Sequence, residues 1–548
     1  MSCHLPYTLK QYLAAVILVV VPILSILAQE KLTFSGSFQG GANWFLEDAE
    51  IGATNTPQYD QELVGVEAWL DLAVQYKGYK VGLRGDFFRN TNLLNPNGAY
   101  SDEGLGRWYV SKSINKFDFL AGHIYDQIGS GLIFRAYEER PLLIDNALIG
   151  GRIKYNPWPN VEAKVMAGKQ KNLFSQYESF IRTGQIEGSF QVGKDKQWSL
   201  IPGFGIVNRS WSDNQVDDII KSLETYTPQD SIGFYFHNWS FSAYNTVSYG
   251  PISFYLEGAF KTQDVYFDAD AERNLYGGGS SLGRFANEDG SIYYGALTYG
   301  AKGFAFSLSG RRTKNFSYRA DPFASLNRGL VNFLPPMSRL NSARLKARYT
   351  PAARDISEKA VQLELRYTFN KKWKMVQYFS NITELDGTIL YREFDNELTY
   401  RKDRFLEVSV GIQAQNYNQE ILEGKTGVDL IRTFVPYFEI QKRLKKRRSM
   451  RIQAQYMITD QDFGSWLFGL AEFNLAPHWS FSVSDMYNVK PKKTDDLHYP
   501  RIDVTYNFKT YRFSLSYLKQ VEGVVCAGGI CRLEPAFSGF RFSTFSTF

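Results

Sequence analysis

The sequence has little charge, few histidines and cysteines, and no long apolar run beyond its N-terminus. Charged residues make up 22% of the 548 residues, and the mean hydropathy is −0.31. After residue 28, no segment reaches the ~18 continuous apolar residues that a membrane-spanning helix needs. A helical membrane protein is therefore excluded. A β-barrel is not, because its strands alternate lipid-facing and lumen-facing residues and average to a soluble composition.

Residues that carry catalysis are equally scarce. Beyond the N-terminal segment only His123, His237, His478 and His498 remain, and none has a partner at a characteristic spacing. The zinc motif His-Glu-x-x-His and the phosphate-binding loop are absent. We therefore expect a protein that is not an enzyme and that uses no cofactor or metal. The formal net charge of +6 is scattered and does not form a stripe, so no nucleic-acid partner is expected.

The first 28 residues have the pattern of a secretory signal peptide. Lys10 supplies the positive charge, Tyr12 to Leu27 form the apolar core, and Ala28 provides a cleavage position. A single-span membrane anchor is the alternative. We expect residues 1–28 to be removed and residues 29–548 to form one domain, because no linker interrupts the remaining chain.

The rest of the chain alternates apolar and polar residues with a period of two, which is the pattern of β-strands. Residues 361–368, for example, alternate Val, Leu, Leu and Tyr with Gln, Glu, Arg and Thr. Short turns alternate with longer connections, as they do in outer-membrane barrels. We predict an all-β fold, a single large antiparallel transmembrane β-barrel of about 24–26 strands. An array of soluble β-sandwiches would need domain linkers about every 100 residues, and none is present.

The longer connections are predicted on one side of the barrel. They cover residues 89–104, 210–233, 262–288 and 313–341, and residues 330–348 hold either a further strand or a segment inside the lumen. Asp264, Asp268, Asp270 and Glu272 form an acidic run in the third connection. Oxygen ligands at alternate positions suit Ca²⁺, but the spacing and glycine of a calcium loop are missing, so a solvated acidic loop is preferred.

The last eleven residues, Ser538 to Phe548, predict an amphipathic strand that ends on an aromatic residue. Phe540, Phe542 and Phe548 fall on one face, opposite Arg541 and Phe545. The segment resembles the closing strand of bacterial outer-membrane barrels, whose terminal aromatic residue is part of the signal read by the barrel-insertion machinery. The resemblance implies contact with that machinery during biogenesis and with outer-membrane lipid afterwards.

Residues 129–152 break the alternation and concentrate charge. The charged residues are Arg135, Glu138, Glu139, Arg140, Asp145 and Arg152. Leu132, Ile133 and Phe134, in the same segment, would be poorly placed in open water. We predict a loop folded into the lumen, with ion pairs that grip the wall and narrow or plug the pore. A loop that caps the barrel mouth is an equal alternative.

The short turns are basic. The strongest cluster comprises Arg443, Lys445, Lys446, Arg447 and Arg448. If these turns face the periplasm, they form a positive rim. The rim either contacts anionic lipid head groups or docks an acidic periplasmic partner.

Two cysteines remain once Cys3 leaves with the signal segment. Cys526 and Cys531 flank Gly528-Gly529 between the last two predicted strands. In an exported protein, an even pair in a small loop predicts a disulfide. A metal-binding pair is the alternative, although no histidine lies nearby in the sequence.

Several segments taken together resemble a family of poorly characterised outer-membrane barrel proteins of Bacteroidota. They are GSGLIFRAYEER at 129–140, IDNAL at 144–148, NFLPPMS at 332–338 and VVCAGGICR around the cysteines. The resemblance implies a barrel in the outer membrane of a Gram-negative cell, reached through the secretory pathway. Barrels of that phylum are often subunits of machines for secretion, surface-protein handling or barrel insertion.

Two hypotheses for function follow. The first is a porin-like channel with a loop-constricted lumen, whose solutes are selected by the inward residues Lys80, Arg84, Arg366, Arg451 and Arg512. The second is a non-enzymatic accessory subunit of an outer-membrane complex, plugged by residues 129–152 and bound to outer-membrane or periplasmic partners.

Overall fold

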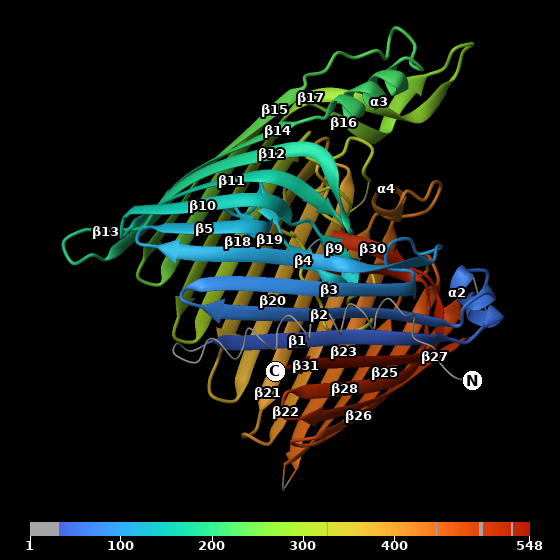
Figure 1. The fold of residues 1–548 in the computed structure, drawn as a ribbon. Coiled ribbons are helices and arrows are strands. Elements are labelled where there is room, and N and C mark those ends of the chain that lie inside the picture. The colour runs from blue at the N-terminus through green and yellow to red at the C-terminus, as the bar shows by residue number, and fades with distance from the viewer. Residues whose placement is uncertain (1–31, 326, 445–446, 493–496, 528–529) are drawn as a thin grey trace.

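The computed structural model shows one closed antiparallel β-barrel (Figure 1). It describes residues 32–325, 327–444, 447–492, 497–527 and 530–548; for Asp270, residues 525–527, Ile530 and Cys531 it describes the backbone alone. The predicted signal peptide, residues 1–28, lies outside the described residues. No helix in the described part of the chain is both long and apolar enough to cross a bilayer.

The barrel has 24 strands. The sheet contains 25 segments, but β12 and β13 both pair with β14 and are two pieces of one interrupted strand. Successive strands pair in chain order, and β31 closes the ring against β1. The prediction of an antiparallel barrel with about 24–26 strands is confirmed.

The barrel strands are β1 (Thr33–Phe45), β2 (Val64–Tyr76), β3 (Tyr79–Thr91), β4 (Tyr100–Ile114), β5 (Phe117–Ile124), β10 (Leu148–Trp158), β11 (Val161–Asn172), β12 (Ser175–Gly188) with β13 (Phe190–Val192), β14 (Trp198–Ser210), β15 (His237–Tyr249), β16 (Ile252–Asn274), β17 (Ser280–Ala301), β18 (Phe304–Lys314), β19 (Ser357–Thr368), β20 (Trp373–Thr383), β21 (Ile389–Arg401), β22 (Leu406–Tyr417), β23 (Ile431–Leu444), β24 (Arg448–Met457), β25 (Gly464–Leu475), β26 (Trp479–Pro491), β27 (His498–Phe508), β28 (Tyr511–Gln520) and β31 (Phe537–Thr547).

The period-two pattern sorts side chains between the two faces of the wall. On β3, Tyr79, Val81 and Leu83 are exposed on the outside, whereas Arg84 and Asp86 are buried on the inside. Because neighbouring strands keep register, the same apolar face continues from strand to strand around the ring.

The two ends of the barrel differ in their connections. At the short-turn end, hairpins such as β2–β3 turn within two residues, and β1 begins and β31 ends there. The long-loop end carries the helices α2 (Pro57–Asp60), α3 (Asp213–Leu223) and α4 (Gln419–Glu423) (Figure 1).

The predicted connection at 262–288 is wrong, because β16 and β17 run through most of it. The two strands continue beyond the rim and support α3, where Ile219 packs with Val265 and Phe285. The preferred interpretation of a solvated acidic loop also fails at Asp264, which is buried and ion-paired with Arg209 and Lys261.

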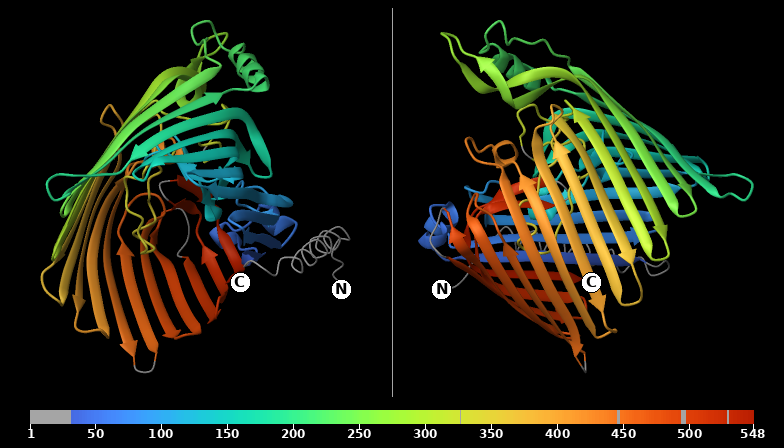
Figure 2. Two further views of the ribbon diagram at one scale, coloured as in Figure 1. Left: turned by 60° about the vertical axis from the view of Figure 1, so that its left-hand side comes forward. Right: turned by 180° about the vertical axis from the view of Figure 1, so that it is seen from behind.

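Two connections fold inward from the long-loop end, and Figure 2 shows chain segments within the ring of strands. The first insert, residues 125–147 between β5 and β10, contains β6 (Asp126–Gln127), β7 (Arg135–Ala136), β8 (Glu138–Glu139), the 3-10 turn η2 (Arg140–Leu142) and β9 (Ile144–Asp145). The second insert comprises residues 315–356 between β18 and β19, and its described residues form no barrel strand. Of the two alternatives for residues 330–348, the structure shows the lumen segment. A separate hairpin, β29 (Gly523–Ala527) with β30 (Ile530–Glu534), joins β28 to β31.

Candidate functional site

The first insert is tied to the wall through a buried guanidinium. Arg84 on β3 is only 1% exposed and donates to Asp86 at 2.6 Å, to Glu138 at 2.7 Å and to Asp145 at 2.7 Å. Glu138 and Asp145 face each other across the β8–β9 pair. Arg84 therefore holds both sides of this small hairpin, and the three carboxylates neutralise a charge that would be costly to bury alone.

The same network extends to other strands. Arg140 donates to Asp71 on β2 at 2.9 Å, to Glu138 at 2.7 Å and to Gln39 on β1 at 3.0 Å. Lys171 on β11 donates to Asp145 at 2.5 Å. Of the predicted plug residues, Glu138, Arg140 and Asp145 thus meet in one cluster with wall residues that the sequence did not identify.

The other predicted plug residues lie elsewhere. Arg152 donates to Asp118 at 2.8 Å and to Asp126 at 2.9 Å, near the start of the insert. The Arg135 guanidinium stacks over the rings of Phe333, at 4.0 Å, and Tyr137, at 4.7 Å. Glu139 pairs through its backbone with Ile144.

The apolar part of the first insert is buried. Ile128, Leu132 and Ile133 are fully buried in a cluster with wall residues such as Val207 and Ile292. At the adjoining turn, Glu257 on β16 is fully buried and accepts hydrogen bonds from four groups: the Ser130 N–H at 2.9 Å and the hydroxyls of Ser130, Ser242 and Tyr255 at 2.5–2.6 Å. Glu257 was missed in the sequence because it has the pattern of any inward polar residue.

The second insert is held chiefly through its backbone carbonyls. An irregular segment cannot satisfy these groups with its own ladder, so another donor must do so when they are buried. Wall side chains supply the donors: Lys261 to Ser317 at 2.8 Å, Arg209 to Arg319 at 2.7 Å, Ser179 to Ala320 at 2.7 Å, Arg311 to Pro335, Ser380 to Met337 at 2.6 Å and Gln413 to Lys346 at 3.1 Å. These donors come from strands β12 to β22.

The two inserts also bind each other. The Phe333 N–H donates to the Gly131 carbonyl, and the Arg135 N–H donates to the Val331 carbonyl, both at 2.9 Å. Asn146 donates to the Leu330 carbonyl at 3.0 Å. With Arg348 stacked on Trp466 of β25, the contacts of the joined inserts reach from β1 round the wall to β25. Arg84 accordingly faces an insert, which corrects the expectation that it lines an open path for solutes.

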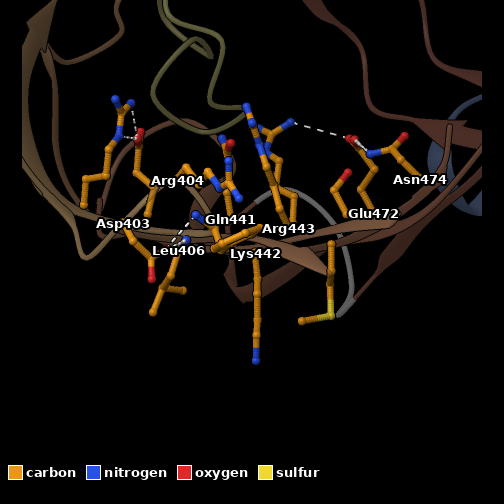
Figure 3. A pocket seen from close by; sticks show the side chains of 14 residues that line it. Asp403, Arg404, Leu406, Gln441, Lys442, Arg443, Glu472 and Asn474 are labelled. Carbon is orange, nitrogen blue, oxygen red and sulfur yellow. Dashed lines mark hydrogen bonds and ion pairs between the residues drawn. The ribbon is translucent and has the colours of Figure 1, made fainter. Parts of the chain in front are cut away.

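A separate polar pocket lies on the wall near the short-turn end (Figure 3). This rim pocket has a volume of about 470 Å³ and is formed by strands β21 to β25 and the turn between β21 and β22. Its lining includes Arg401, Arg404, Glu407, Gln441, Arg443, Arg451, Glu472 and Asn474. Of the predicted basic rim, Arg443 lines the pocket, Arg447 and Arg448 are exposed, and Lys445 and Lys446 lie outside the described residues.

Aromatic rings, most of them exposed, form a belt on the outside of the short-turn end. Neighbouring strands contribute pairs with ring centroids about 4.5–4.7 Å apart: Phe117 with Tyr155, Trp198 with Tyr249, Trp373 with Tyr400 and Trp479 with Tyr506. This belt was not predicted from the sequence. Its signal was present there, because each ring lies within three residues of the end of a strand.

The C-terminal strand occupies the closing position. β31 pairs with β1 on one side and β28 on the other, and the Phe548 N–H donates to the Gly36 carbonyl at 3.0 Å. The Phe548 ring lies 6.2 Å from Phe34 on the exposed outer face, and Phe540 is exposed as well. Phe542 shares their strand parity.

The hairpin β29–β30 brings the two cysteines together in register. Cys526 and Cys531 are direct partners across the two strands. Their side chains lie outside the described part of the structure, so the disulfide stays a prediction.

The sequence contains one Gly-x-Ser-x-Gly motif, a pattern that carries the nucleophilic serine of some hydrolases. Gly279-Ser280-Ser281-Leu282-Gly283 has the spacing of a nucleophile elbow, which requires a sharp turn from strand to helix. Here β17 begins at Ser280 and continues to Ala301 as a strand. The motif therefore lacks the backbone that would activate its serine.

Comparison with known proteins adds a family. Residues 9–548 match the family of unknown function DUF6029. The chain belongs to this family. No curated protein matches this DUF6029 chain. Solved structures with a similar shape include the translocation pore of the P pilus usher PapC, with a TM-score of 0.45 at 10% identity over 94% of this chain and 99% of that one.

A receptor and a transporter give lower scores. The siderophore receptor PirA from Pseudomonas aeruginosa has a TM-score of 0.41 at 8% identity, over 94% of this chain and 80% of that one. The ferric citrate transporter FecA has a TM-score of 0.41 at 9% identity, over 94% and 78%. No function for the DUF6029 chain follows from scores this low.

Proposed function

We propose that the protein is an outer-membrane β-barrel that works as a porin-like channel, with its lumen held closed by the two inserts. The observation that carries the proposal is the ring of contacts that joined inserts make from β1 round to β25. A segment held by side chains on so many strands lies across the path of a solute.

The outer face supports a membrane location. Trp239 and Tyr249 both point outward from β15 and are ten residues apart. Ten residues of strand rise about 34 Å. At a tilt of roughly 40° they span about 25 Å, the height of the apolar band in outer-membrane barrels. The signal peptide, the Bacteroidota origin and the insertion signal at Phe540, Phe542 and Phe548 stay predictions that agree with this location.

The way the inserts are attached supports closure that can be reversed. The first insert is held by ion pairs, and charges that leave such pairs are stabilised again by water. The second insert has ion pairs too, such as Lys346 with Asp395 at 2.5 Å, but fixed wall side chains from β12 to β22 also donate hydrogen bonds to its backbone carbonyls. We therefore assign the moving part to the first insert.

Conductance in planar lipid bilayers tests the proposal. The full chain is expected to conduct weakly, and deletion of residues 131–145 is expected to raise the conductance. An Arg89→Gln variant serves as a control, because Arg89 lies on the same strand as Arg84 but on the outer face, and its ion pair with Glu62 is exposed. A folded deletion variant that conducts no more than the full chain would contradict the proposal.

A further inference from the structure

The rim pocket holds more guanidinium groups than its carboxylates engage. Arg401 pairs with Glu407 at 2.5 Å, and Arg451 pairs with Glu439 at 3.0 Å and with Glu472 at 3.6 Å. Two of the four arginines in the lining, Arg401 and Arg451, thus have carboxylate partners. The carboxylates of Glu407, Glu439 and Glu472 are engaged in these pairs.

The remaining acidic residue of the lining is occupied too. Asp403 accepts from the N–H groups of Phe405 and Leu406, at 2.7 and 3.1 Å, and so closes the turn between β21 and β22. Within the described ranges of the chain, Arg404 and Arg443 have no carboxylate partner; Arg404 stacks only on the ring of its neighbour Phe405, at 4.8 Å.

The unpaired arginines lie on the inner side of the wall. In Figure 3, Arg404, Gln441 and Arg443 rise on one side of the ribbon, and Lys442 points the opposite way. The alternation of β23 gives the same result, because Phe438 on the same face as Lys442 is exposed outside the barrel. The positive charges of Arg404 and Arg443 therefore lie on the side of the wall that forms the pocket.

We propose that the rim pocket binds an acidic peptide segment of a periplasmic partner protein. Guanidinium groups bind carboxylates through paired, directional hydrogen bonds. Alternate side chains of an extended peptide are about 6.8 Å apart, and neighbouring strands of the wall are about 4.8 Å apart. The long, flexible arginine side chains can cover the difference, so a peptide that crosses the strands can offer one carboxylate to each arginine. A pocket of about 470 Å³ also exceeds the space that one small anion fills.

The proposal makes the barrel a docking subunit as well as a closed channel. It rests on the proposed outer-membrane location, which directs the short-turn end to the periplasm. It does not rest on conduction, because peptide binding is measured on the full chain in detergent. A negative conductance result would therefore not contradict peptide binding, and a negative binding result would not contradict the channel.

Fluorescence anisotropy with a labelled peptide of about six Asp-Ala repeats tests the site. We expect the full chain to bind this peptide and not its Lys-Ala counterpart. Binding should weaken at least about tenfold in the double variant Arg404→Gln, Arg443→Gln. It should also weaken as NaCl rises from about 50 to about 500 mM, because salt screens exposed charges.

Lys442→Gln is the matched control for Arg443→Gln, since it removes one positive charge from the neighbouring position of β23, on the outer side. Unchanged binding in the double variant, or equal losses in the double variant and in Lys442→Gln, would overturn the site. Equal competition by sodium acetate at the same carboxylate concentration would overturn the assignment to a peptide. If the double variant does not fold, the single variant Arg443→Gln replaces it, with a smaller loss expected.

Discussion

Arg84 is the residue on which attachment of the first insert depends most. Replacing Arg84 by Gln leaves Asp86, Glu138 and Asp145 without their shared cation in a buried site. Removing one partner of a buried ion pair costs about 3–5 kcal/mol. We expect Arg84→Gln to raise conductance and to expose the first insert to protease. Arg89→Gln, on the same strand, breaks an exposed pair worth about 0–1 kcal/mol and should change neither.

Asp145 makes the attachment dependent on pH. Burial by itself raises the pKa of Asp145, but the nearby charges of Lys171 and Arg84 outweigh it and hold the pKa below the ordinary 3.8. The pKa of Asp126 is lowered in the same way by Lys164. A carboxylate with a depressed folded-state pKa stabilises the fold above its ordinary pKa, and the stabilisation is lost as pH falls through the folded value.

The first insert should therefore stay closed from neutral pH down to about 4 and be released at lower pH. Single-channel conductance at stepwise decreasing pH measures this. Asp145→Asn should conduct more than the full chain already at neutral pH, with a smaller further rise in acid. Opening centred near neutral pH would contradict a gate held by these carboxylates.

At the scale of elements, the hairpin β29–β30 carries a prediction of its own. Directly opposed residues of antiparallel strands have Cα atoms about 4.5–5.5 Å apart, within the range that a disulfide bridges. We expect the mature protein to resist alkylation at Cys526 and Cys531 until it is reduced, as read by mass spectrometry. The variant Cys526→Ser, Cys531→Ser should still close its barrel, because β31 is held by β1 and β28. Free thiols in the exported protein would contradict the disulfide.

Strands were predictable from the sequence because alternation is a local property. The first insert was also visible, since residues 129–152 break the alternation and carry charge. Its partners were not, because Arg84 and Asp71 lie more than fifty residues away and meet the insert only once the ring closes. The error at 262–288 has the same origin. Asp264 belongs to an acidic run, which is typical of a loop, and only the folded chain brings Arg209, 55 residues away in the sequence, beside it.

At the scale of the whole molecule, the 24 strands close into a ring, so the barrel sheet has no free edge strand. The side chains on its outer face therefore determine whether the barrel is stable in lipid or in water. The sequence predicted that the strands close into a barrel and about how many there are, but not which residues pair. The aromatic belt depends on neighbouring strands placing their ends at one level, which the register of the sheet sets.

A charge introduced on the outer face distinguishes lipid from water. Ile412 is exposed on the outer side of β22, between the level of Tyr400 in the belt and that of Phe434 nearer the long-loop end. In hydrocarbon, arginine at the midplane costs about 2–4 kcal/mol, falling to about 0–1 near the interface. We expect Ile412→Arg to lower the free energy of unfolding by that larger amount in lipid vesicles, measured by urea titration. Leu406→Arg, at the short-turn end of the same strand, should cost much less. Equal small losses would mean that the outer face does not lie in a membrane.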